Sequence, residues 1–166
     1  LQNVKISAER LFDILDEQPQ VVNRPGARRI DTVKGAVTLD QVTFGYVPET
    51  TVLDAISLDV KPGDTIALVG PTGCGKSTIL SLLMRFYDVT GGRILIDGVD
   101  VRDFELKSLR RNFGIVLQES LLFTVSIADN IRYARPSASR KQVEFAARIA
   151  EIHNEILALP NGYDSV

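Results

Sequence analysis

The spacing of hydrophobic residues changes along the chain, and each change predicts a different element. Between residues 3 and 17 apolar residues recur every three or four positions, which predicts an amphipathic helix. From Ala36 the period becomes two, which predicts a strand from Val37 to Phe44 whose phase slips at Gln41. Residues 53–60 are expected to form its hairpin partner. The chain therefore begins with a helix followed by an antiparallel pair of strands.

The rest of the chain alternates between short apolar strands and helices. Residues 65–69 are a short apolar run bounded by turn residues, as expected for a strand buried on both faces. A helix is expected over residues 75–87, and a capping-box pattern over residues 139–142 predicts the start of a later one. The other expected elements are strands over 93–97 and 113–117, a short helix over 106–111, and mainly helical structure beyond Thr124.

Composition excludes several classes of protein. The 166 residues suit one domain, or one domain with a short appendage, and 45 % hydrophobic with 24 % charged residues is typical of a globular chain. A net charge of −2 gives no electrostatic footprint for nucleic acid, so we expect no nucleic-acid partner. The single cysteine excludes an internal disulfide framework, and no apolar run is long enough to span a bilayer.

The strongest chemical signal is a glycine-rich loop over residues 70–77, which matches G-x-x-x-x-G-K-[ST] at every position. Glycines admit positive φ and leave backbone amides open to phosphate oxygens, and the following helix adds the positive end of its dipole. We expect Lys76 to reach the β and γ phosphates of ATP, Ser77 to ligate Mg²⁺ and Thr78 to bond the α phosphate. The candidate nucleotide-binding residues of the loop are Gly70, Pro71, Thr72, Gly73, Cys74, Gly75, Lys76, Ser77 and Thr78.

The order of the motifs around this loop resembles the nucleotide-binding domain of an ABC transporter. Val42-Thr-Phe-Gly-Tyr46 precedes the loop, and Gly92-Arg-Ile-Leu-Ile-Asp-Gly98 and Phe113-Gly-Ile-Val-Leu-Gln118 follow it. More narrowly, Gln118-Glu-Ser-Leu-Leu-Phe123 followed by Ile127-Ala-Asp-Asn-Ile131 resembles exporters that fuse membrane and nucleotide-binding domains in one chain. The predicted first helix resembles the connector between the two domains in that subfamily.

The resemblance implies an α/β fold: a P-loop NTPase core with an antiparallel β subdomain at its N-terminal side and the start of a helical subdomain. Residues 1–33 would be a connector helix and linker from a missing transmembrane domain. Residues 34–166 would be the N-terminal part of an ABC ATP-binding domain, with the helical subdomain starting near residue 125. The signature loop, the acidic strand end, the catalytic glutamate and the switch histidine of the family are expected after Val166, so the domain is expected to be truncated.

The resemblance also implies roles for two residues outside the loop. Tyr46 matches the aromatic residue that stacks on adenine, and Gln118 matches the glutamine that contacts Mg²⁺ and the attacking water. Lys76 and Gln118 are therefore the candidate catalytic residues of the chain. The implied partners are a second nucleotide-binding domain, in a head-to-tail dimer, and the transmembrane domains of the same transporter, at the cytoplasmic face of a membrane.

The resemblance leaves more than one function open. Besides the fused exporter, the chain could come from a detached ABC ATPase of an importer or of a soluble DNA-handling complex. It could also bind nucleotide without hydrolysing it, which is what we expect of these 166 residues alone because no residue matches the catalytic glutamate. A P-loop kinase of small metabolites is a more distant alternative, because Tyr46 and Gln118 occur in the ABC order.

Overall fold

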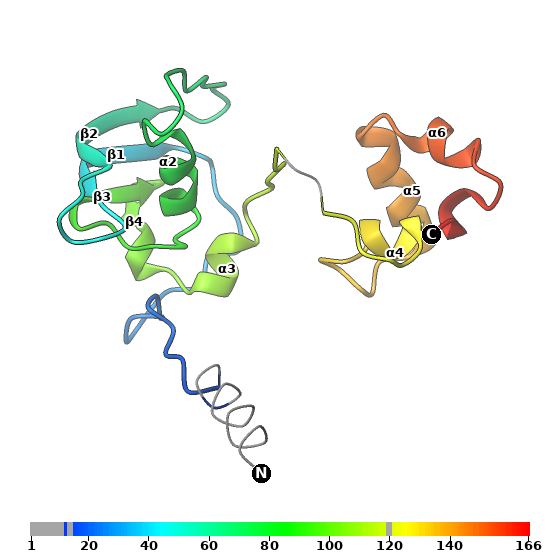
Figure 1. The fold of residues 1–166 in the computed structure, drawn as a ribbon, viewed down its shortest axis with the longest axis horizontal. Coiled ribbons are helices and arrows are strands. Elements are labelled where there is room, and N and C mark those ends of the chain that lie inside the picture. The colour runs from blue at the N-terminus through cyan, green and yellow to red at the C-terminus, as the bar shows by residue number, and fades with distance from the viewer. Residues whose placement is uncertain (1–11, 13–14, 119–120) are drawn as a thin grey trace, which may run out of the picture. The chain divides into compact units, whose positions relative to one another are not determined.

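The computed structural model describes residues 12, 15–118 and 121–166, and most of the helix predicted over residues 3–17 lies outside this part. The chain divides into two compact units, Leu1–Gly114 and Ile115–Val166, which are considered separately (Figure 1). In the described part, no helix is both long and apolar enough to cross a membrane.

The first unit is built on a four-stranded antiparallel sheet in the order β2-β1-β3-β4. Its strands are β1 (Val37–Phe44), β2 (Leu53–Val60), β3 (Gly91–Ile96) and β4 (Val99–Asp100). The period-two pattern therefore predicted the β1–β2 pair correctly. The antiparallel subdomain expected on the N-terminal side of the glycine-rich loop is present.

The phase slip predicted at Gln41 is a β-bulge in β1. The pairing of β1 with β2 shifts between Leu39 and Val42, its pairing with β3 shifts beyond Asp40, and Gln41 has a φ of +49°. An extra residue in one strand reverses which side chains face the core. Leu39, Val42 and Phe44 are consequently all buried, with 2 %, 0 % and 3 % of their surface exposed.

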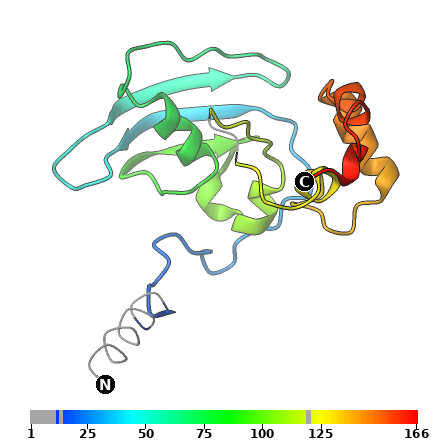
Figure 2. The same cartoon turned by 45° about the vertical axis from the view of Figure 1, so that its right-hand side comes forward.

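One face of the sheet is covered by α2 (Lys76–Leu83), the helix that follows the glycine-rich loop (Figure 2). Leu82 of this helix is buried in the same cluster as Ile94 and Leu109. The helix is shorter than predicted because Arg85 adopts a left-handed φ of +52°, which α-helix geometry does not allow. The unit is completed by the 3₁₀ turn η1 (Val101–Asp103) and by α3 (Leu106–Arg110), where a short helix was predicted.

Two predicted strands are not formed. Residues 65–69 and 113–117 have no strand assignment, and their side chains are largely exposed, up to 90 % at Val69 and 97 % at Val116. An apolar run becomes a strand only when a neighbouring strand supplies its backbone hydrogen bonds. Neither run has such a neighbour in the part of the chain that the structure describes. The prediction of a strand was therefore wrong for both runs, and so was that of burial on both faces for residues 65–69.

The second unit is helical, as predicted beyond Thr124. Its elements are α4 (Ile127–Ile131), α5 (Arg140–Ile149), α6 (His153–Leu157) and the 3₁₀ turn η2 (Gly162–Asp164). The predicted capping box is present, because Ser139 and Gln142 bond reciprocally at the start of α5. The buried residues of its small core are Ala128, Val143, Ala147, Ile156 and Tyr163.

The turn between β3 and β4 anchors the segment that leads into β1. Its two residues, Asp97 and Gly98, both have positive φ (+51° and +81°), as a type I′ turn requires. The Asp97 carboxylate accepts hydrogen bonds from the backbone N–H groups of Lys34, Gly35 and Ala36, at 2.6, 3.1 and 3.0 Å. Partial desolvation acts to raise the pKa of Asp97, but these three donors and the Lys34 charge outweigh it and lower the pKa.

Asp97 should therefore make the free energy of unfolding depend on pH in the acidic range. A carboxyl whose pKa is lowered on folding stabilises the protein above its ordinary pKa of 3.8, and that stability is lost as pH falls through the lower folded value. We expect Asp97→Asn to lower the urea midpoint at pH 7, and the difference from wild type to shrink below about pH 4. Asp54→Asn, at an exposed carboxylate of β2, is the control. A difference that persists unchanged at pH 3 would contradict this role.

Candidate nucleotide site

The glycine-rich loop leads directly into α2, and its backbone has the geometry that glycine permits. Gly73 and Gly75 have φ values of +85° and +93°. A Cβ atom on Gly75 would lie 2.6 Å from Leu53 Cδ2, and one on Gly70 would lie 2.7 Å from Cys74 Sγ. Side chains at these positions would strain the loop or displace its neighbours, so the glycines of the motif fit a compact loop.

The first turn of α2 is suited to an anion. Gly75 is the N-cap of the helix and offers no side chain to cap it. The first N–H groups of a helix have no partner within the helix, and together with the helix dipole they favour a bound negative group. The helix N-terminus that the motif predicted beside the phosphates is therefore present.

Lys76 folds back over the loop. Its Nζ atom donates hydrogen bonds to the carbonyl oxygens of Gly70 and Pro71, at 2.9 and 2.8 Å, and lies 3.7 Å from Cys74 Sγ. The ammonium group thus lies over the same loop whose amides the motif assigns to phosphate. A phosphate there would offer this cation a stronger, charge-assisted partner than a carbonyl oxygen.

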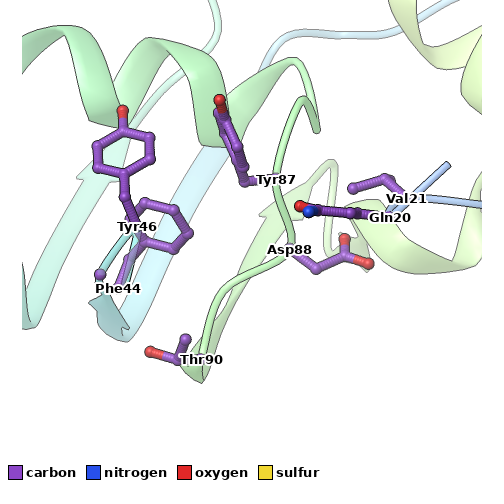
Figure 3. A pocket seen from close by; sticks show the side chains of 8 residues that line it. Gln20, Val21, Phe44, Tyr46, Tyr87, Asp88 and Thr90 are labelled. Carbon is purple, nitrogen blue, oxygen red and sulfur yellow. The ribbon is translucent and has the colours of Figure 1, made fainter. Parts of the chain in front are cut away.

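Tyr46 is connected to the helix that follows the loop. Its hydroxyl lies 3.2 Å from Oγ1 of Thr78, which is buried in the first turn of α2. Tyr46 is 51 % exposed, and its ring packs edge-on against Phe44 and Tyr87, with centroids 4.9 and 5.1 Å apart (Figure 3). The residue predicted to stack on the base and a residue predicted to bond the α phosphate therefore contact each other.

A hollow of about 240 Å³ adjoins this aromatic group. In Figure 3, Phe44 and Tyr46 lie on one side of it and Gln20 and Val21 on the other. The remaining lining residues are Gly45, Tyr87, Asp88 and Thr90. No sequence pattern indicated the hollow, because Gln20 lies in a segment with the composition of a linker.

Two site residues that were predicted are not joined to the loop by a described contact. Ser77 is exposed in the first turn of α2, beside Lys76, and no partner is seen for its hydroxyl among the described residues. Gln118 belongs to the second unit, where it is exposed. Their roles toward Mg²⁺ remain predictions.

The most buried charged residue of the first unit was missed. Arg85 is 1 % exposed and is ion-paired through its Nε atom with Asp88 at 2.8 Å. The available signal was an arginine directly after the apolar run Leu82-Leu-Met84, with an aspartate three positions later.

A glycine-rich loop at the start of a helix that covers a sheet defines the chain as a P-loop NTPase of the ABC ATPase type. The family model described as "ABC transporter" matches residues 53–161. The chain therefore belongs to the ABC transporter family.

Individual relatives cover nearly the whole chain. It is 46 % identical over 165 residues, 99 % of its length, to the heavy metal tolerance protein of Schizosaccharomyces pombe, and covers 20 % of that protein. It is 46 % identical over 163 residues to human ATP-binding cassette sub-family B member 6, covering 98 % of this chain and 19 % of the relative. The chain thus spans about a fifth of the length of these curated relatives.

A solved structure of a bacterial Atm1-family ABC exporter with ATP bound superposes with a TM-score of 0.89 at 43 % identity. That match covers 99 % of this chain and 29 % of the exporter chain. The likeness in sequence and in structure therefore extends over both compact units.

Proposed function

We propose that this chain is the ATP-binding module of an ABC membrane exporter, in which ATP binding and hydrolysis are coupled to substrate translocation. The observation that carries the proposal is the contact between Tyr46 and Thr78, which joins the residue predicted to stack on the base to the helix predicted to bind the phosphates. The similarity to a bacterial Atm1-family ABC exporter that was solved with ATP bound supports it. The same similarity also favours it over a detached ATPase of an importer or a DNA-handling complex.

Each residue of the site has a part that its chemistry supports. The loop from Gly70 to Gly75 would surround the phosphates with backbone N–H donors, and Lys76 would move from its two carbonyl partners to the β and γ oxygens. Ser77 and Gln118 carry oxygen ligands of the kind that Mg²⁺ takes. When bound, Mg²⁺ would neutralise charge on the phosphates.

The proposed partners follow from the same assignment. A second nucleotide-binding domain would close head to tail on the nucleotide, and the transmembrane domains of the same transporter would convert closing and opening into alternating access. Residues 1–33 would connect this module to the membrane part, and residues 34–166 would form the ATP-binding domain up to and including the first helices of its helical subdomain. The module would lie at the cytoplasmic face of a membrane.

Replacing Tyr46 tests the base side of the site, which is the part proposed to bind the adenine base. We expect Tyr46→Ala to weaken ATP binding by about 1–3 kcal/mol, the usual contribution of a base stacked on an aromatic ring. Binding of inorganic tripolyphosphate should not change, because it has no base. Isothermal titration of both ligands measures this difference, with Tyr133→Ala, at an exposed tyrosine of the second unit, as the control. Equal losses for both ligands would make Tyr46 a residue of the fold instead.

Hydrolysis by the 166 residues alone should be no faster than background. No residue of the chain matches the family's catalytic glutamate, so none can position the attacking water as the family does. The exposed apolar runs 65–69 and 113–117 should also favour self-association. A malachite-green phosphate assay and size-exclusion chromatography measure the two properties. Steady turnover that Lys76→Ala abolishes, from a monomer, would refute both expectations.

A further inference from the structure

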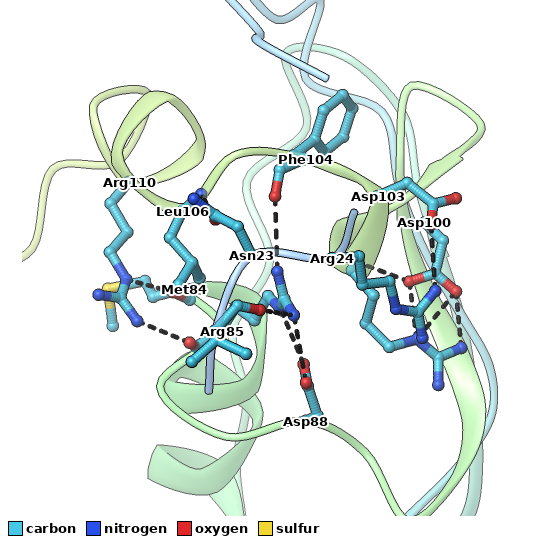
Figure 4. Close-up of polar contacts among 12 residues, drawn as sticks. Asn23, Arg24, Met84, Arg85, Asp88, Asp100, Asp103, Phe104, Leu106 and Arg110 are labelled. Carbon is cyan, nitrogen blue, oxygen red and sulfur yellow. Dashed lines mark hydrogen bonds and ion pairs between the residues drawn. The ribbon is translucent and has the colours of Figure 1, made fainter. Parts of the chain in front are cut away.

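The segment between the predicted first helix and the sheet is held on the body of the first unit. We call residues 20–30 the strap. Its composition, with a proline, a glycine and three arginines, is that of a linker. The structure instead gives its backbone and side chains a series of partners around α3 and the end of α2 (Figure 4).

Four contacts attach the strap to residues 103–106. Asn23 Oδ1 accepts a hydrogen bond from the backbone N–H of Leu106, at 2.8 Å, at the start of α3. Arg24 is paired with the Asp103 carboxylate at 3.0 Å. Further along, Arg28 N–H donates to the carbonyl oxygen of Asp103 at 2.7 Å, and its carbonyl accepts from Glu105 N–H at 2.8 Å. Two of these four are bonds between backbone groups, which sequence composition does not reveal.

Arg85 brings a buried guanidinium into contact with the strap. Its Nη2 atom donates to the carbonyl oxygen of Val22 at 3.0 Å, and Nη1 lies 3.4 Å from the carbonyl oxygen of Phe104. Nε and Nη2 also bond the two carboxylate oxygens of Asp88, at 2.8 and 3.2 Å. A buried guanidinium is costly unless its donors are met, so the strap carbonyl is part of what stabilises this charge.

The same residues form part of the hollow beside Tyr46. Asp88 lines the hollow, and so do Gln20 and Val21, the two strap residues that precede Val22 (Figure 3). Arg85 therefore fixes the side of the hollow that faces the aromatic group, through Asp88 and through the strap. The amide of Gln20 can both donate and accept, which matches the adjacent donor and acceptor on the edge of an adenine.

We propose that the strap forms part of the base-binding side of the nucleotide site, and that Arg85 is the positioning residue that holds it there. This rests on the proposed function, because it takes Tyr46 as the base platform and the glycine-rich loop as the phosphate site. The strap leads from the predicted first helix into the site.

The test compares ATP with inorganic tripolyphosphate in three variants of the protein. Gln20→Ala removes an exposed side chain of the strap, and Arg85→Lys keeps the charge but loses the fork that reaches both Asp88 and Val22. Arg110→Lys is the matched control. Its guanidinium bonds the carbonyl oxygens of Met84 and Arg85, at 3.1 and 2.7 Å, at the same helix end but without a bond to the strap.

We expect ATP affinity to fall roughly fivefold in Gln20→Ala and roughly tenfold in Arg85→Lys, from the usual worth of one or two hydrogen bonds. Tripolyphosphate affinity should stay within about twofold in both, and the ratio of the two affinities should not change in Arg110→Lys. Amide hydrogen exchange gives a second readout. ATP, but not tripolyphosphate, should slow exchange at the N–H groups of Arg28 and Ile30, which bond Asp103 and Ser108.

The outcomes separate this inference from the proposed function. If wild-type protein bound neither ligand, the proposed function and the strap's role would both be rejected. If wild type bound both, but Gln20→Ala left the ATP-to-tripolyphosphate ratio unchanged, only the strap's role would be rejected. Equal losses for both ligands in Arg85→Lys would show that Arg85 supports the fold of α2 and nothing on the base side.

Discussion

Lys76→Ala is expected to weaken ATP binding at least a hundredfold. The lysine supplies charge-assisted hydrogen bonds to two phosphate oxygens, worth about 3–5 kcal/mol together. The same ammonium group bonds the carbonyl oxygens of Gly70 and Pro71, but these lie in an exposed loop and can bond water instead. The folded chain should therefore tolerate the change, and the loss should be one of ligand affinity.

Titration with a fluorescent ATP analogue measures the effect. Lys107→Ala is the control, because it removes one positive charge from an exposed position of α3. If the long-range field of the protein were the source of affinity, both variants would lose it similarly. Unchanged affinity in Lys76→Ala, with a melting temperature near that of wild type, would refute the assignment of this loop to phosphate.

The parts of the fold that the sequence predicted well depend on contacts between residues close in the chain. Strand β1 could be predicted together with its irregularity, because the interruption at Gln41 shifts the apolar pattern by one residue. The capping box at Ser139 is likewise local, since both of its hydrogen bonds join residues three positions apart. Loop residues 70–77 were found because the motif specifies residue types as well as spacing.

The parts that could not be predicted depend on partners far away in the sequence. An apolar run such as 65–69 has the composition of a strand, but composition does not tell whether another strand lies beside it. The bond between Tyr46 and Thr78 spans 32 positions, and that between Arg85 and Val22 spans 63. Neither contact produces a periodic pattern of residues in the sequence. Much of the base side of the candidate site therefore became visible only in the structure.

The tight approach of β1 to β3 gives the largest expected effect on the fold. Gly92 in β3 has a φ of +70°, and a Cβ atom there would overlap the carbonyl oxygens of Asp40 and Gln41, which belong to the bulge. Both atoms are backbone and cannot rotate away. We expect Gly92→Ala to destabilise the protein by about 3–5 kcal/mol, combining the cost of a left-handed conformation with that of overpacking. Natural domains are stable by only about 5–15 kcal/mol, so the variant should be close to unfolding.

Gly98→Ala separates the two causes. Gly98 has a similar φ of +81° in the β3–β4 turn, but a Cβ atom there would meet nothing within 4 Å. Only the conformational cost of about 1–2 kcal/mol should apply to it. Urea unfolding followed by circular dichroism measures both variants, and the difference between them isolates the clash with the bulge. If the two variants were equally destabilised, the backbone conformation alone would be the reason for glycine at position 92. The bulge at Gln41 would then place no steric demand on β3.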